Sequence, residues 1–128
     1  MKISKLKISS NFFLAPMSGI SDFPYREVVK EFKPGLVFSE MIASRALIEK
    51  NKKTLKMIKK DSNEISAIQI AGCDPDIMAE AAIICEGNGS DLVDINMGCP
   101  VKKVVNGYAG SALMKNEVLK RIGTPVNL

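Results

Sequence analysis

Residues 91–103 read DLVDINMGCPVKK and indicate both the fold class and the place where chemistry would be carried out. The short run Leu92–Ile95 predicts a buried strand, and the loop after it carries an amide, a thiol, a proline and two lysines. Parallel α/β proteins place their active sites in loops at the carboxyl ends of strands. We therefore interpret this loop as a candidate site. The alternative is a tight turn in which the small Cys99 thiol simply packs inward.

Three earlier runs predict further buried strands, at Phe12–Ala15, Leu36–Phe38 and Ala67–Ala71. Helical patterns separate and follow the strands, at residues 21–33, 44–60, 74–87 and 111–119. Residues 3–8 alternate loosely between apolar residues and lysines and predict a short exposed hairpin or lid strand. Strands and helices that alternate with short connections predict a parallel sheet with right-handed crossovers. Two architectures satisfy this pattern: an open doubly wound sheet and a (β/α)8 barrel.

The first two predicted helices differ in character. In the first, Asp22 is placed to cap the start, and an apolar stripe at helical spacing is formed by Val28, Val29 and Phe32. The second is rich in lysines that we expect on a solvated face, namely Lys50, Lys52, Lys53, Lys56, Lys59 and Lys60.

The composition is that of one soluble globular domain. Of the 128 residues, 46% are hydrophobic and 25% are charged. No apolar run approaches the ~18 residues of a membrane span, and the first residues lack the apolar core of a signal peptide. We therefore expect a cytoplasmic protein. The net charge of +4 is compatible with a polyanionic partner but does not demand one.

The cysteine and histidine content excludes several kinds of site. The three cysteines, Cys73, Cys85 and Cys99, are widely spaced and form no CxxC pair, which argues against a disulfide framework. The sequence has no histidine, so histidine-based triads, histidine general bases and most zinc sites are excluded. No cluster of carboxylates indicates another metal, and we expect none.

Polar residues mark the ends of the other predicted strands. Gln69 lies in a strand that should be apolar on both faces, so it needs a hydrogen-bonding partner, either a backbone group or a bound cofactor. The turn Pro16-Met17-Ser18-Gly19 has small residues that would let a flat ligand approach the backbone, although a plain connection is an equal alternative. The second strand delivers Glu40 at its carboxyl end.

Taken together, these segments resemble the amino-terminal part of a tRNA-dihydrouridine synthase, nearest the bacterial type. The resemblance covers about residues 12–119. Its most specific segment is Asn-x-Gly-Cys-Pro, whereas Ala-Pro-Met is shared with other flavin barrels. The residues that carry it are LAPMSGISDFPYR (14–26), SEM (39–41), IQI (68–70), DINMGCPVKK (94–103) and AGSALM (109–114).

The resemblance implies a (β/α)8 barrel that binds FMN at the carboxyl ends of its strands. It also implies that NADPH reduces this flavin. The implied reaction reduces uridine in tRNA to 5,6-dihydrouridine. By position, the resemblance implies Pro16, Met17, Ser18 and Gln69 at the flavin, Asn96, Glu40, Lys102 and Lys103 at the tRNA substrate, and Cys99 as the proton donor.

A thiol suits the implied acid role. Hydride addition to uracil C6 leaves negative charge that needs a proton at C5, and a free thiol with a pKa of ~8.5 is mostly protonated at neutral pH. Lys102 and Lys103 would lower the pKa of Cys99 if they faced its sulfur. We therefore expect them to face RNA phosphates. A stacked base must also be extruded to reach the site, so we expect a mobile loop beside a basic surface.

The chain length corresponds to half a barrel. A complete barrel needs ~250 residues, so residues 1–128 supply the amino-terminal half of an FMN-binding barrel domain, about four β/α units, without the carboxyl-terminal half or the helical tRNA-binding domain. We expect a deletion or reading-frame change near Lys120, and an exposed edge on the fourth strand that could drive self-association. Two other functions stay open: a non-catalytic remnant, and an FMN barrel that reduces a free pyrimidine.

Overall fold

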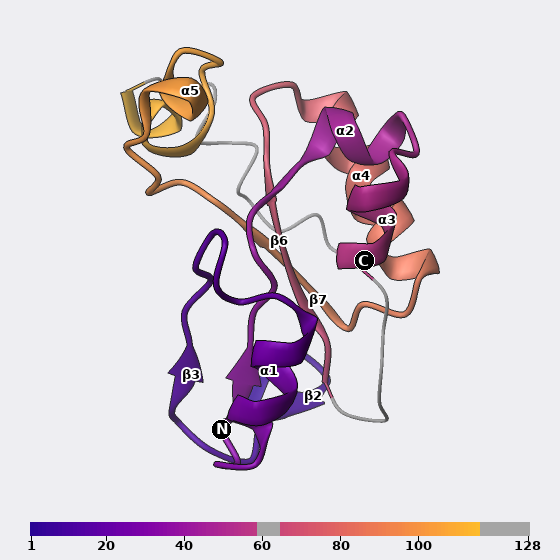
Figure 1. The fold of residues 1–128 in the computed structure, drawn as a ribbon, viewed down its shortest axis with the longest axis vertical. Helices are drawn as coiled ribbons and strands as arrows, with labels where there is room; N and C mark the ends of the chain where they lie inside the picture. Colours follow the sequence, from indigo (N-terminus) through magenta and orange to yellow (C-terminus); the bar gives the residue numbers. More distant parts are fainter. Residues whose placement is uncertain (59–64, 116–128) are drawn as a thin grey trace.

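The computed structural model describes residues 1–58 and 65–115 (Figure 1). Its strands are β1 (Lys2–Ile3), β2 (Leu6–Lys7), β3 (Phe13–Leu14), β4 (Leu36–Val37), β5 (Ile42–Ala43), β6 (Ala67–Ala71) and β7 (Leu92–Ile95). Its helices are α1 (Phe23–Lys30), α2 (Ser44–Ile48), α3 (Lys52–Met57), α4 (Pro75–Gly87), α5 (Lys102–Val105) and the 3-10 helix η1 (Gly110–Lys115). The predicted amino-terminal hairpin is confirmed, because β1 and β2 pair antiparallel.

The main strands lie side by side in the order of the sequence, and all their pairings are parallel. β3 pairs with β4, β5 with β6, and β6 with β7. A single parallel bridge from Phe38 to Ala67 joins the two groups. The Rossmann type of doubly wound sheet instead has the order 3-2-1-4, with its first strand between the second and fourth. The observed order therefore favours the barrel alternative for these strands, which here form open sheets.

β4 and β5 are two parts of one strand that is interrupted by a bulge. Phe38 lies opposite Ala67, and Ile42 lies opposite Ile70. Three residues therefore separate the paired positions on one strand and two on the other, which is the one-residue excess of a β-bulge. The sequence did not predict this short second part, because the bulge depends on the register between strands.

The hydrophobic core lies between the β5–β6–β7 sheet and the helices α2, α3 and α4, which gather beside these strands in Figure 1. β7 contributes to it with the partly buried Val93 and Ile95, which pack against the cluster. The buried cluster comprises Ile42, Leu47, Ile58, Ile68, Ile70, Met78, Ala81 and Cys85. The prediction of β6 as a strand buried on both faces is confirmed, since all five of its residues are buried.

Two predicted helix starts are confirmed by their capping hydrogen bonds. The Asp22 carboxylate accepts from the backbone N–H of Tyr25 at 3.1 Å and starts α1. The Asp74 carboxylate accepts from two backbone N–H groups at 3.0 and 3.2 Å, and Pro75 occupies the first position of α4. Both arrangements satisfy N–H groups that have no partner inside a helix.

The single helix predicted over residues 44–60 was wrong. The chain forms α2 and α3 instead, separated by a break in which Lys50 adopts a left-handed backbone conformation with φ of +53°. The Asn51 side chain then accepts from the N–H of Lys53 at 3.0 Å and caps the second helix. Of the six lysines predicted on a solvated face, Lys59 and Lys60 lie outside the described residues, and the other four are exposed.

The burial predicted around β3 and α1 was also wrong. Phe12 is 80% exposed, and the predicted stripe leaves Val28 58% and Phe32 81% exposed. The buried residue of α1 is Arg26, whose guanidinium donates to the carbonyl of Ser21 at 2.8 Å. The physical reason is that β3 has a strand neighbour on one edge only within the described part of the chain, so little surface is available to cover these side chains.

The region after β7 also differs from the prediction. Residues predicted as loop include the short helix α5, and the helix predicted over 111–119 begins as a 3-10 helix at Gly110. Residues 116–119 and the departure predicted near Lys120 lie outside the described residues. β7 is half-buried rather than buried, since its outer edge has no strand neighbour in the described ranges. No helix in those ranges is both long enough and apolar enough to span a membrane.

Candidate active site

The candidate site lies at the carboxyl ends of the parallel strands. The segments that reach it are the turn after β3, the bulge between β4 and β5, the middle of β6, and the loop after β7 (Figure 1). In this view the strands of the main sheet run upward, so these segments leave the sheet at the same end. This common edge is where α/β proteins assemble catalytic groups from several strands.

Gln69 of β6 is bound by two side chains of the neighbouring strand. Its side chain is 6% exposed, and its Nε2 donates to Asp94 Oδ2 at 2.6 Å. Its Oε1 accepts from Asn96 Nδ2 at 2.9 Å. Asp94 lies directly opposite Gln69 in the β6–β7 register. The backbone partner that the sequence offered as one alternative is therefore wrong, and the contact with a cofactor stays a prediction.

Asn96 connects Gln69 to the loop that carries Cys99. Its backbone N–H donates to the carbonyl of Ile70 at 2.9 Å, which extends the sheet by one residue. Its side-chain Oδ1 accepts from the backbone N–H of Cys99 at 2.9 Å and from that of Gly98 at 3.3 Å. The side chain thus fixes the start of the loop, in the manner of an Asx turn.

Cys99 is half-buried and is held from a second side by Gly110. The Cys99 carbonyl accepts from the N–H of Ser111 at 3.0 Å. Gly110 has φ of +61°, and a Cβ built on it would lie 2.6 Å from the Cys99 carbonyl oxygen. Only glycine therefore lets η1 approach the loop this closely. Cys99 as a residue is only partly buried, unlike a core cysteine, and the alternative of an inward-packed thiol stays open.

Cys85 shows what a core thiol looks like in this protein. It is fully buried in α4, and burial raises the pKa of its thiol to about 11. A thiol in such surroundings is a poor nucleophile and is inaccessible to a substrate. Cys73 and Cys99 are the two cysteines with partial access. Only Cys99 lies in the hydrogen-bonded group that contains Gln69.

The turn after β3 is built around Ser21. The backbone N–H of Met17 donates to Ser21 Oγ at 2.8 Å, and this hydroxyl donates to the Met17 carbonyl at 3.0 Å. Ser21 is fully buried, whereas Pro16 and Met17 are half-buried and Ser18 is exposed. The turn is therefore held from its inner side, and its outer face is available to a ligand.

Glu40 and Ser39 join this turn to the rest of the site. Glu40 Oε1 accepts from the backbone N–H of Gly19. Buried Ser39 accepts from the N–H of Gln69 at 3.1 Å and donates to the carbonyl of Glu40 at 2.9 Å. At the bulge, the Glu40 side chain thus reaches the turn after β3, and the Ser39 side chain binds β6. Glu40 was predicted to contact substrate, and that contact stays a prediction.

Lys102 and Lys103 lie at the start of α5 and are exposed. Neither forms an ion pair within residues 1–58 and 65–115. In Figure 1, α5 stands apart from α2 and α4, at the far end of the loop that leaves β7. Their predicted contact with RNA phosphates stays a prediction. No group of three or more Cys, Asp or Glu side chains in the described residues is arranged to hold a metal ion.

The sequence singled out Gln69, Asn96 and Cys99, and the structure brings all three into one hydrogen-bonded group. It missed Ser21, Ser39, Asp94 and Gly110. Asp94 carried the same signal as Gln69, a polar residue within a strand predicted to be buried, and could have been found by the same reasoning. The roles of Ser21 and Ser39 depend on the contacts between strands and have no local signal.

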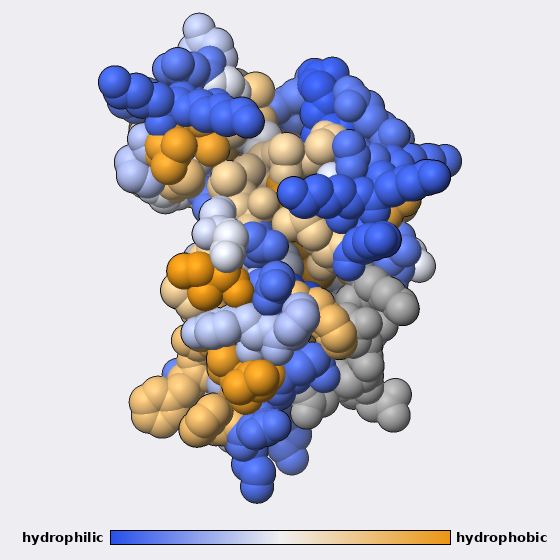
Figure 2. Space-filling view, viewed as in Figure 1, coloured by the Kyte–Doolittle hydropathy of each residue, from blue (hydrophilic) through white to orange (hydrophobic). Residues whose placement is uncertain are grey.

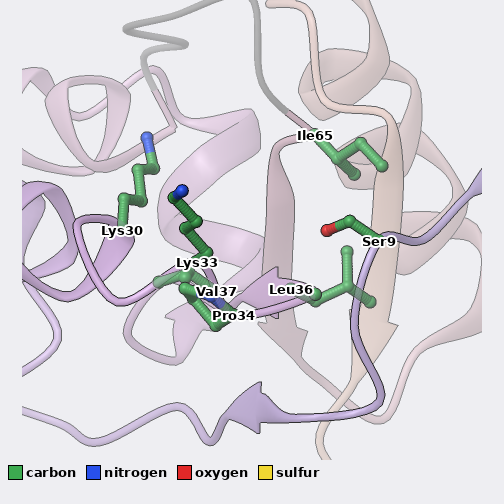
Figure 3. A pocket seen from close by; sticks show the side chains of 8 residues that line it. Ser9, Lys30, Lys33, Pro34, Leu36, Val37 and Ile65 are labelled. Carbon is green, nitrogen blue, oxygen red and sulfur yellow. The ribbon is translucent and has the colours of Figure 1, made fainter.

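Two described hollows lie away from this site. One, of about 380 Å³, lies at the amino end of β4, opposite to the end that carries Glu40. In Figure 3, Lys30 and Lys33 stand on one side of it, and Ser9 and Ile65 on the other. A second, of about 360 Å³, is a groove between α4 and the exposed side of β7. Neither is lined by Gln69, Asn96 or Cys99.

Comparisons with known proteins are consistent with this geometry. Residues 13–122 match the family model described as dihydrouridine synthase (Dus). The chain is 51% identical over 121 residues to a probable tRNA-dihydrouridine synthase of Rickettsia conorii, covering 93% of this chain and 37% of that protein. It is 41% identical over 138 residues to tRNA-dihydrouridine synthase B of Pasteurella multocida, covering 100% and 42%. The chain thus spans roughly two fifths of the length of these relatives.

Proposed function

Since this chain belongs to the dihydrouridine synthase family, we propose that it forms the part of a tRNA-dihydrouridine synthase that carries the proton donor. The proposed reaction is reduction of the C5–C6 double bond of uridine in tRNA to 5,6-dihydrouridine. The observation that carries the proposal is the hydrogen-bonded group of Gln69, Asn96 and Cys99 at the carboxyl ends of two adjacent strands. It supports the proposal because the backbone of a partly buried cysteine is bound to carboxamide groups of the kind suited to a pyrimidine ring.

The proposed architecture is a (β/α)8 barrel to which residues 1–128 contribute about four β/α units. Strictly sequential parallel strands support this proposal, because each strand of such a barrel pairs with its neighbours in the sequence. The unpaired edges of β3 and β7 in the described ranges are the two positions at which further barrel strands would pair.

The proposed cofactor is FMN, with NADPH as its reductant. The chemistry of the residues fits the flavin ring. Pro16, Met17 and Ser18 offer small and apolar groups that are partly or fully exposed, and the Gln69 carboxamide retains one N–H and one lone pair beyond its contacts with Asp94 and Asn96. FMN, when bound and reduced, supplies the hydride for the C6 position of uracil.

Cys99 is the proposed proton donor. After hydride addition at C6, negative charge develops at C5 and on the adjoining carbonyl, and the Cys99 thiol transfers its proton to C5. One hydride and one proton thereby complete the reduction, and solvent returns a proton to the thiolate. Asn96 and Gly110 fix the backbone of Cys99 from two sides, which limits the positions that its sulfur can adopt.

The proposed partner is tRNA, and the proposed location is the cytoplasm. Lys102 and Lys103 support the first proposal because they are exposed directly after the loop that carries Cys99. Lysines in that position could bind the phosphates on either side of an extruded nucleotide. The exposed β7 edge is the surface at which self-association was predicted, and that stays a prediction.

The proposal is tested by measuring dihydrouridine in tRNA by mass spectrometry. Cells that lack the gene would receive the full chain, its Cys99→Ala variant or its Cys73→Ala variant. We expect the first and third to restore dihydrouridine and the second to lower the rate by about 10²–10⁴-fold, the usual contribution of a general acid. Cys73 is the matched control because it is also a half-buried thiol.

Absorbance of the purified proteins separates loss of cofactor from loss of chemistry. We expect the visible bands of oxidised flavin in all three proteins, because Cys99 is not proposed to hold FMN. A colourless wild-type protein that restores no dihydrouridine would contradict the proposal and would support the non-catalytic alternative. Reduction of free uracil without any need for folded tRNA would instead support the free-pyrimidine alternative.

A further inference from the structure

We infer that Asp94 is a positioning residue, whose carboxylate fixes the direction in which the carboxamides of Gln69 and Asn96 point and so holds the Cys99 loop. We call Asp94, Gln69 and Asn96 the carboxamide network. The direction of its hydrogen bonds follows from the geometry alone. Its importance for catalysis rests on the proposed function of Cys99.

The argument starts from what each group can donate or accept. An ionised carboxylate only accepts, so the atom of Gln69 that lies 2.6 Å from Asp94 Oδ2 must be its NH2 group. The oxygen of Gln69 then faces Asn96, which must present its own NH2 group at 2.9 Å. The oxygen of Asn96 is therefore left to accept from the backbone N–H of Cys99.

Both ends of the network demand the same direction. At the far end, the backbone N–H groups of Cys99 and Gly98 can only donate, so they require the oxygen of Asn96. Rotating either carboxamide by half a turn would set oxygen against carboxylate or N–H against N–H. Gln69 is 6% exposed, so water could not easily replace the lost hydrogen bonds.

Asp94 has no evident alternative role in the described structure. It forms no ion pair within the described residues and belongs to no group that could hold a metal there. Within the described residues its side chain accepts a hydrogen bond from Gln69, which is charge-assisted and therefore of the stronger kind. A half-buried carboxylate in the middle of a strand is costly, which indicates that this contact serves a purpose.

The test compares hydrogen exchange of the Cys99 and Gly98 amides by NMR in the full chain. In Asp94→Asn the substituted side chain can donate as well as accept, so the direction of the network is fixed only from the end at Cys99 and Gly98. We expect both amides to exchange about tenfold faster, as for the loss of one net hydrogen bond. The matched control is Asp91→Asn, which removes the same charge from the residue just before β7, where the carboxylate accepts from the N–H of Ser66 at 2.9 Å. In the control we expect both amides to exchange within about twofold of wild type.

A double variant that restores the protection of the two amides distinguishes a change in carboxamide orientation from general damage to the structure. The double variant Asp94→Asn with Gln69→Glu moves the carboxylate from β7 to β6, where it can accept from both neighbouring amides. Asn96 must then again present its NH2 group to β6 and its oxygen to Cys99, so we expect protection to return to within about threefold of wild type. Gln69→Glu alone places its new carboxylate opposite that of Asp94. In this single variant we expect the Cys99 and Gly98 amides to exchange as fast as in Asp94→Asn.

Circular dichroism would verify that every variant is folded. Unchanged exchange in Asp94→Asn would overturn the inference. So would a double variant that exchanges no more slowly than the single ones. Because the experiment uses neither flavin nor tRNA, its result is independent of whether the proposed activity is found.

Discussion

The two halves of the molecule differ in how well their apolar side chains are covered. Around β5, β6 and β7, the helices α2, α3 and α4 bury a continuous cluster. Around β3 and α1, large apolar side chains stay exposed, among them Phe12 at 80% and Phe32 at 81%. Figure 2 shows apolar surface over the part of the molecule that holds β3 and α1 in Figure 1.

The difference shows that an apolar pattern predicts burial only where a neighbouring element exists to provide it. β6 has a strand on each side and is buried throughout, whereas β3 has one neighbour in the described part of the chain. In a closed barrel every strand has two neighbours. We therefore interpret the exposed side chains of β3 and α1 as a surface that is covered in a complete barrel.

The largest expected effect lies in the covered half. Leu47 is fully buried in the cluster, so Leu47→Ala should lower the free energy of unfolding by about 2–5 kcal/mol. Urea unfolding followed by circular dichroism would measure it. A loss of less than about 1 kcal/mol would contradict the picture of a tightly packed cluster.

An intermediate effect is expected from pH, through Cys85. Burial raises the pKa of its thiol from the ordinary value of 9.0 to about 11. The unfolded chain therefore loses this proton at lower pH than the folded one, so stability is unaffected by this group below pH 9 and falls as pH rises toward 11. The full loss would be about 2–3 kcal/mol.

The contribution of Cys85 is isolated by repeating the measurement with Cys85→Ala. This variant is less stable below pH 9 because of the cavity, but its stability should decline less steeply between pH 9 and 11. Equal slopes in the two proteins would show that the thiol is not shielded as described.

The smallest effect is expected in the uncovered half. Phe32→Ser replaces a side chain that is 81% exposed, so the free energy of unfolding should change by no more than about 0.5 kcal/mol. Sedimentation velocity should show weaker self-association, because the apolar surface is reduced. A destabilisation comparable to that of Leu47→Ala would remove the contrast between the halves.

The sequence predicted those features that depend on local patterns. The caps at Asp22 and Asp74, the strand β6 and the loop with Cys99 are all set by a few adjacent residues. The break at Lys50 could not be predicted, because a left-handed backbone at a lysine has no sequence signature.

The sequence predicted some members of the candidate site but not the contacts between them. Gln69 and Asn96 were identified singly, and their shared contact depends on the register between β6 and β7. The same holds for the contact between Ser39 and Gln69, which lies beside the bulge. Registers between strands far apart in the sequence are fixed by the assembled sheet and not by any one segment.

The bulge at residues 39–41 affects the site without changing the pairing of the core residue Ile42. With one residue fewer, the strand would be regular, and Ile42 would still lie opposite Ile70 and keep its place in the cluster. The surplus residue is therefore not needed to place Ile42 in the cluster. What it provides is the freedom for Ser39 to turn toward β6 and for Glu40 to reach Gly19. A strand shortened by one residue would therefore keep Ile42 in the core but lose the contacts that Ser39 and Glu40 make in the site. The length of this segment is thus set by the site as well as by burial.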